Sequence, residues 1–246
     1  VSTFRDQLQF TVEEGRLLSP EEGAALDLAD FMPASPYPLD AMMDELMGLI
    51  REEFRYKPWR KLVDGVFKNE ELREAFRTCP AAKGVHHAYA GGLLEHTLSV
   101  TKLCDYYINY YPMINGDLLY TAAMCHDIGK VYELSAFPAN DYTDEGQLLG
   151  HIMIGAEMVG ERTRQIPGFP VKLGNELKHC ILAHHGELEY GSPKKPALLE
   201  AIALNFADNT AAHMQSLIEA LKAAGDIQAW LGYNRLFEST IRKTSK

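Results

Sequence analysis

The stretch Ala122-Ala-Met-Cys-His-Asp-Ile-Gly-Lys130 decides the fold, because it joins an apolar helical run to a histidine–aspartate pair. Outward from it, apolar residues recur at three- and four-residue steps, which is the period of an amphipathic helix. Gly- and Pro-rich segments separate the predicted helices, which cover residues 39–54, 58–67, 69–78, 90–111, 116–128, 148–164, 172–185, 196–222 and 226–239. The sequence therefore predicts an all-α fold, a helical bundle of eight or nine helices.

The N-terminal residues have a different character. The alternating apolar residues Phe4, Leu8, Phe10 and Val12 predict a short strand, and Ser19-Pro20-Glu21-Glu22 predicts a helix start with Ser19 as N-cap and proline in the first position. Three prolines within residues 33–38 favour a linker. We therefore expect an N-terminal appendage over residues 1–35 and a helical domain over residues 36–246.

Composition limits the class of protein. The 246 residues carry a net charge of −10 and are 46% hydrophobic, as in a globular protein with a substantial core. The first 50 residues hold ten acidic and two basic side chains, so the acidity is mostly N-terminal. This charge argues against a passive, charge-driven binder of nucleic acid. No apolar run is long enough to span a membrane, no signal peptide is visible, and the four cysteines form no C-x-x-C, which together favour a cytoplasmic protein.

Five histidines and two aspartates recur at intervals of about one helix plus a loop. The intervals are 30, 24, 33 and 23 residues, and the residues are His96, His126, Asp127, His151, His184, His185 and Asp208. A single helical histidine is more often structural, but this joint pattern favours a metal site inside a helical bundle. Imidazole and carboxylate together suit Fe, Mn, Zn or Ni rather than Ca, and a carboxylate can bridge two ions.

At these residues the sequence resembles the HD-domain superfamily of metal-dependent phosphohydrolases. The segments that extend the match, and that resemble the YhaM-type 3′→5′ exoribonucleases, are 86–98, 126–130, 145–152 and 184–193. In that family the HD domain follows an oligonucleotide-binding (OB) fold. Residues 4–33 resemble the end of the OB domain, most of which is absent. With valine as the first residue, we expect a truncated form or a gene fragment.

The resemblance implies a centre of two divalent transition-metal ions, with Mn or Fe foremost and Zn, Ni, Co and Mg left open. It implies that His96, His126, Asp127 and Asp208 hold the first ion. Asp127 would bridge to a second ion completed by His151, His184 and His185. The nucleophile implied is a water acidified by the two ions.

Several neighbouring residues are candidates for catalysis and substrate binding. Lys130 is placed to reach a phosphate oxygen, and its position after Gly129 beside the predicted metal ligands favours this over a solvated lysine at a helix end. His86 and His87 precede the first ligand helix, and their alternatives of substrate contact, proton donation and capping stay open. Tyr190, Lys194 and Lys195 lie in a loop after His185, where a tyrosine could stack on a base and lysines could pair with phosphates.

We therefore expect a metal-dependent phosphohydrolase that cleaves phosphodiester bonds, with Asp127, Lys130 and His87 as catalytic residues. The favoured activity is 3′→5′ exoribonuclease-like, on single-stranded RNA or DNA. The alternatives are an HD phosphohydrolase for small or cyclic nucleotides and a non-catalytic HD sensor module. The expected partner is nucleic acid or a nucleotide and not a membrane, and a homo-oligomer stays open.

Overall fold

The computed structural model describes residues 2–4, 7–9, 11–26, 33–83, 87–136, 139–224 and 229–245. The chain divides into two compact units, Val1–Met32 and Pro33–Lys246. No described helix is long and apolar enough to cross a membrane.

The first unit holds a short hairpin and one helical turn. Strands β1 (Ser2–Phe4) and β2 (Gln7–Gln9) pair antiparallel. Helix α1 (Pro20–Ala24) starts as predicted at Ser19, whose hydroxyl accepts the backbone N–H of Glu22 while the Glu22 carboxylate accepts the backbone N–H of Ser19. This reciprocal pair is a capping box. Of the residues predicted as strand, Phe10 lies outside the described residues and Val12 follows the hairpin as exposed coil.

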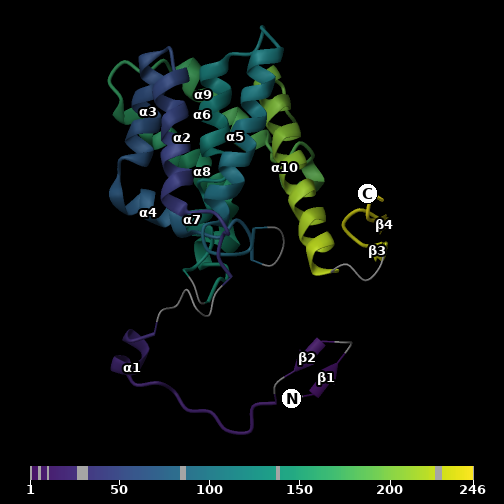
Figure 1. Ribbon diagram of the computed structural model, residues 1–246. Coiled ribbons are helices and arrows are strands. Elements are labelled where there is room, and N and C mark those ends of the chain that lie inside the picture. Colours follow the sequence, from purple (N-terminus) through teal and green to yellow (C-terminus); the bar gives the residue numbers. More distant parts are fainter. Residues whose placement is uncertain are drawn as a thin grey trace. The chain divides into compact units, whose positions relative to one another are not determined.

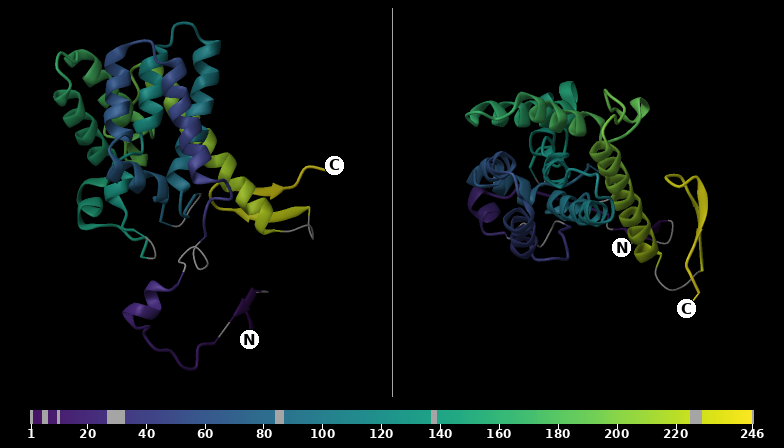
Figure 2. Two further views of the ribbon diagram at one scale, coloured as in Figure 1. Left: turned by 60° about the vertical axis from the view of Figure 1, so that its left-hand side comes forward. Right: turned by 90° about the horizontal axis from the view of Figure 1, so that it is seen from above.

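The second unit confirms the all-α prediction (Figures 1 and 2). Nine α-helices occur among its described residues: α2 (Leu39–Glu53), α3 (Lys57–Phe67), α4 (Glu70–Thr78), α5 (Gly92–Tyr110), α6 (Gly116–Cys125), α7 (Lys130–Glu133), α8 (Asp144–Gln165), α9 (Val171–Ala183) and α10 (Leu199–Ala223). The 3₁₀ turn η2 (Leu188–Tyr190) lies in the connection from α9 to α10.

Helix α6 forms the centre of this domain. All its residues from Leu118 to Cys125 are buried, and it packs against α3, α5, α9 and α10. The Asn115 side chain caps it by accepting the backbone N–H of Leu118. A helix that is apolar on all sides is stable only inside a core. His126 and Asp127, which directly follow the C-terminal end of α6, are therefore buried in the interior.

The first residues of the proline-rich segment before α2 are bound to the helical domain. Backbone hydrogen bonds join Ser35 to Ala90 at 2.9 Å and Ala90 to Pro33 at 3.0 Å. The Ser35 hydroxyl also donates to the Glu95 carboxylate at 2.7 Å. Residues 33–35 are thus held against the start of α5.

The prediction of a helix over residues 226–239 is wrong. The chain forms a β-hairpin there, with β3 (Trp230–Asn234) antiparallel to β4 (Ser239–Arg242). Aromatic residues in β3 and β-branched residues in β4 favour an extended chain. Gly232, at φ +87°, and Glu238, at φ +47°, adopt left-handed conformations that a helix cannot accommodate. The apolar residues Trp230, Tyr233 and Phe237 follow one another at steps of three and four residues, which imitates a helical period.

Candidate metal centre

Five elements bring the seven predicted metal-binding residues together. His96 lies in α5, His126 and Asp127 directly follow α6, His151 follows a kink in α8, His184 and His185 follow α9, and Asp208 lies in the middle of α10. The kink occurs at Gly150, whose φ of +72° interrupts the helix. Four of the seven thus come at helix ends, where the chain can turn a side chain inward, rather than from regular helical positions as the spacing suggested.

Asp127 lies between two groups of histidines. Its Oδ2 atom is 3.6 Å from His96 Nε2 and 3.3 Å from His126 Nε2. Its Oδ1 atom is 3.4 Å from His151 Nε2 and 3.6 Å from His184 Nε2. Each carboxylate oxygen therefore faces one pair of imidazoles, which is the arrangement that a bridging carboxylate requires.

Asp208 and His185 complete the two groups. Asp208 Oδ1 lies 3.0 Å from His96 Nε2 and 3.9 Å from His126 Nε2. The rings of His184 and His185 are 4.2 Å apart, and donor atoms of these two and His151 lie within 4.8 Å of one another. Two ligands bound to one ion at about 2.1 Å and at angles between octahedral and tetrahedral lie about 3.0–3.4 Å apart. The observed separations need little adjustment to reach these values.

The other ring nitrogen of four histidines already has a partner. Nδ1 of His126, His184 and His185 donates to the backbone carbonyls of Ala123, Ile181 and Tyr190, at 2.8, 2.6 and 2.9 Å. Nδ1 of His151 donates to Glu133 Oε1 at 3.0 Å. A proton fixed on Nδ1 leaves the Nε2 lone pair free, which is how metal-binding histidines are normally oriented.

Glu133 is a functional candidate that the sequence interpretation missed. Its Oε1 atom accepts both the ring Nδ1–H and the backbone N–H of His151, at 3.0 and 2.9 Å. The signal available in the sequence was its position, seven residues after His126 and outside the histidine pattern. Its carboxylate stands behind the ligand and does not join the cluster.

Gly129 allows the turn after α6 to approach α8 closely. A Cβ atom at this position would lie 2.1 Å from the carbonyl oxygen of His151 and 2.7 Å from the backbone nitrogen of Gly155. Neither backbone atom can retreat without moving α8. The glycine of the His-Asp-Ile-Gly-Lys motif thus sets the distance between Asp127 and His151.

The donor set fits divalent transition-metal ions. Among the described residues, Asp127 Oδ1, His151 Nε2 and His184 Nε2 are buried and have no hydrogen-bond partner, although they face one another. A buried polar atom without a partner costs free energy, and a cation among the three would satisfy all of them. Five imidazoles with two carboxylates suit Mn, Fe, Zn or Ni better than Ca.

The charges of the cluster favour an anionic Asp127 and neutral imidazoles at His184 and His185, but not at His126. Burial acts to raise the pKa of Asp127, but the Lys130 ammonium and His126 outweigh it and hold that pKa well below its usual range. Burial lowers the pKa of His184, and burial together with His184 lowers the pKa of His185. The pKa of His126 is raised, because Asp127 and Asp208 outweigh the burial that would lower it.

A cavity of about 480 Å³ opens onto this cluster. Its lining includes His96, Asp127, Lys130, His151, His185 and Asp208 from the predicted site. It also includes residues that the sequence did not suggest, namely Lys83, Glu133, Tyr142, Asn209, His213 and Ser216. The volume lies within the range of small-molecule sites and suits one or two nucleotide units.

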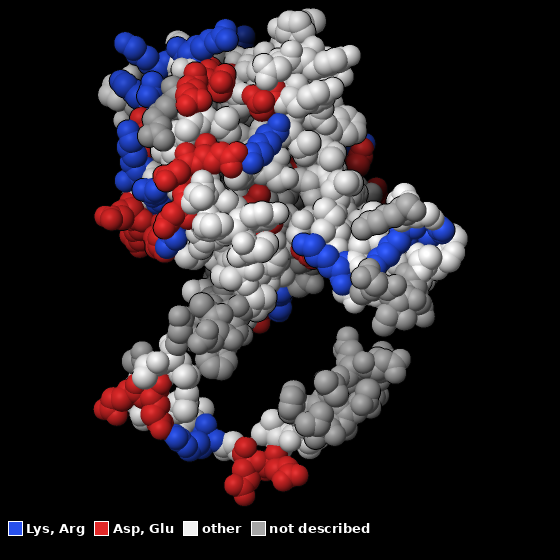
Figure 3. All heavy atoms as spheres, in the orientation of Figure 1, with Lys and Arg blue, Asp and Glu red and all other residues white. Residues whose placement is uncertain are grey.

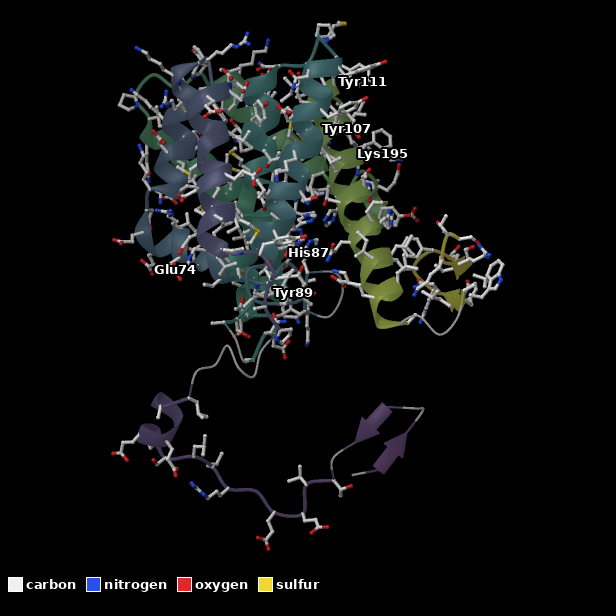
Figure 4. All side chains as sticks on the ribbon, viewed as in Figure 1. Glu74, His87, Tyr89, Tyr107, Tyr111 and Lys195 are labelled. Carbon is white, nitrogen blue, oxygen red and sulfur yellow. The ribbon has the colours of Figure 1, made fainter. Side chains whose placement is uncertain are left out.

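The predicted substrate residues divide into two groups. Tyr190 lines the cavity with its side chain 64% exposed. Lys194 and Lys195 do not line it, and Lys195 pairs with Glu187 at 2.5 Å. Figure 4 shows Lys195 beside the upper half of α10, away from His87. A role for either lysine in substrate binding stays a prediction.

Lys130 and His87 occupy different positions relative to the cavity. Lys130 donates from Nζ to Asp127 Oδ2 at 2.6 Å and lines the cavity, and Asp127 raises its pKa against the effect of burial. His87 is buried with its ring 5.5 Å from that of His96, but it lines a neighbouring groove beside Glu95. A catalytic role stays a prediction for both, and His86 lies outside the described residues.

Comparison with known proteins defines the class. The family model described as "HD domain" matches residues 93–213, which run from the start of α5 to the middle of α10 and include all seven clustered residues. The protein belongs to the HD-domain family and is a metal-dependent hydrolase of that type.

Curated relatives place it more closely. It is 35% identical over 225 residues to the 3′-5′ exoribonuclease YhaM of Geobacillus sp.. The aligned residues cover 90% of this chain and 67% of the relative. The YhaM proteins of Bacillus subtilis and Listeria innocua are 36% and 34% identical, with 90% of this chain and 69% of each relative covered. The chain therefore belongs to the YhaM family of HD-domain proteins. No significant match was found among solved structures.

Proposed function

We propose that this protein removes nucleotides from the 3′ end of single-stranded RNA in a reaction that depends on two divalent metal ions. The observation that carries the proposal is the division of Asp127, with one carboxylate oxygen facing His96 and His126 and the other facing His151 and His184. The relatives carry the name 3′-5′ exoribonuclease, and this supports RNA as the polymer and the 3′ end as the point of attack.

His96, His126, Asp127 and Asp208 would hold one ion, and Asp127, His151, His184 and His185 the other. Bound there, such ions supply Lewis-acid stabilisation of phosphoryl oxygens and an acidified water for hydrolysis. The chain contributes orientation: carbonyls and Glu133 hold the proton on Nδ1 of the histidines, and Lys130 fixes Asp127 by a 2.6 Å ion pair. These groups are set before substrate arrives, so little reorganisation is needed during the reaction.

The cavity has groups for a phosphate and for a base. Lys83 and Lys130 lie in its wall, and Lys83 Nζ pairs with Asp141 at 2.6 Å. Since both partners of that pair are more than half exposed, the pair is weak and a substrate phosphate can replace Asp141. Tyr142 and Tyr190, both partly exposed, offer faces on which a base can stack.

The test uses 5′-labelled single-stranded RNA with Mn²⁺, beside a panel of nucleotides and cyclic nucleotides. We expect progressive shortening from the 3′ end with release of mononucleotides. Asp127→Asn should slow this at least about a hundredfold, because removal of one pre-organised electrostatic group typically costs that much. Asp40→Asn, at a side chain that is 90% exposed on α2, is the matched control and should retain the wild-type rate.

The two alternatives give different results. Hydrolysis of nucleotides with intact RNA would replace the proposal by a small-nucleotide phosphohydrolase. Inertness toward the whole panel, in protein that contains both ions, would indicate a non-catalytic module.

A further inference from the structure

The C-terminal hairpin lies at the mouth of the metal cavity. Leu236, in the turn between β3 and β4, forms part of the cavity lining together with His213 of α10. The ring of Phe237, the next residue in that turn, is 5.8 Å from the ring of His213. Because Asp208 lies on the same helix and lines the same cavity, the hairpin turn and the predicted metal-binding residues share this cavity. Figure 1 shows the hairpin beside the C-terminal part of α10.

One face of this hairpin carries exposed aromatic rings. The register pairs Trp230 with Arg242 and Tyr233 with Thr240. Residues two apart in a strand point to the same side, which places Thr240 and Arg242 together. Directly opposed residues in an antiparallel pair also point to the same side, so the partners Trp230 and Tyr233 lie on that side as well. Trp230 is 57% and Tyr233 69% exposed, so both rings face solvent from this side.

The hairpin is also basic in a protein that is acidic overall. Its described residues hold Arg235, Arg242 and Lys243 against the single acid Glu238, whereas the whole chain carries −10. The Arg242 guanidinium lies 5.7 Å from the centre of the Trp230 ring, in a cation–π contact. Figure 3 shows basic side chains on the hairpin surface.

Exposed aromatic rings alternating with cations form the surface that proteins use to hold single-stranded nucleic acid. Bases stack on the rings with little sequence preference, while cations pair with the phosphates. Trp230 and Tyr233 are three residue steps apart along β3, a distance of about 10 Å, which leaves room for successive bases. The cavity accommodates only the terminal units, so the rest of the strand must leave across its rim.

We propose that the hairpin β3–β4 binds the single-stranded segment on the 5′ side of the terminal nucleotides held in the cavity. This inference rests on the proposed function and names the surface that selects a polymer over a short substrate. A self-association surface is the competing role for exposed aromatic residues, and the test distinguishes it.

The experiment compares kcat/KM for a 20-nucleotide single-stranded RNA with that for the dinucleotide ApA, which ends within the cavity. The ratio of the two values is the readout. In the double variant Trp230→Ala/Tyr233→Ala this ratio should fall about tenfold or more, as expected for the loss of two stacking platforms. Tyr106→Ala/Tyr110→Ala, which removes an equally exposed stacked pair on α5, should retain the wild-type ratio.

Arg242→Ala gives a second readout. If Arg242 pairs with a phosphate, the slope of log KM for the 20-nucleotide RNA against log salt concentration should decrease by about 0.7 in this variant. An unchanged ratio in the aromatic variant together with an unchanged salt slope would overturn the inference. So would a shift of the aromatic variant to a smaller species in gel filtration with the ratio retained. A wild-type protein that cleaves neither RNA nor ApA would instead overturn the proposed function.

Discussion

Glu133→Gln tests how His151 is held in the ligand group that it forms with His184 and His185. The Glu133 side chain is 11% and that of His151 14% exposed, and Oε1 lies 3.0 Å from Nδ1. Burial acts to raise the pKa of Glu133, but the hydrogen bonds from His151 outweigh it and the pKa is lowered, so the group is anionic at neutral pH. Glutamine retains an acceptor oxygen and removes the charge that increases the basicity of the His151 ring.

Loss of such a partner typically weakens metal binding 10- to 100-fold, or about 1.4–2.7 kcal/mol. We expect calorimetric titration with Mn²⁺ to show this loss for one of two equivalents, because His96, His126 and Asp208 do not contact Glu133. Glu157→Gln, at an exposed position on α8, the helix that carries His151, is the control and should bind both equivalents normally. Two equivalents at wild-type affinity in Glu133→Gln would refute the positioning role, as would an equal loss at both.

Two further predictions concern packing and protons. Gly129→Ala should lower the free energy of unfolding of the metal-free protein by about 3 kcal/mol, because the added Cβ would lie 2.1 Å from a backbone oxygen. Gly65→Ala, in open space on α3, should instead raise this free energy by up to about 1 kcal/mol. Equal unfolding midpoints for the two variants would contradict this. Acidification should release metal in two steps, since protons compete with ions for imidazole. Because the pKa of His126 is raised, the ion held by His96, His126 and Asp208 should leave at the higher pH. Because the pKa values of His184 and His185 are lowered, the ion held by these two residues and His151 should stay bound to lower pH. Elemental analysis after dialysis across pH 8 to 5 measures this, and a single step or the reverse order would contradict it.

The helical domain was predictable because its signals are local. Apolar periodicity and caps such as Asn115 act within a few residues, and the helices at the core begin and end close to the predicted positions. The hairpin at residues 230–242 was not predictable in this way, because Trp230, Tyr233 and Phe237 have a helical spacing, and the strand pairing with its two left-handed positions overrides it.

The clustered histidines and aspartates were accessible through their spacing, whereas their supports were not. Glu133 accepts from the ring of His151, and the Asn205 amide donates to the backbone carbonyl of His184 at 2.7 Å. Each partner is about 20 residues away in sequence, and nothing next to Glu133 or Asn205 indicates the contact. Lys83 and Tyr142 reach the cavity through loops, whose paths depend on packing and not on periodicity.

Anomalous diffraction from crystals of the protein with Mn²⁺ tests the central claim most directly. The geometry of Asp127 predicts two manganese peaks about 3.5–4 Å apart, with one carboxylate oxygen of Asp127 on each ion. A single peak, or two peaks without Asp127 between them, would contradict the two-metal centre.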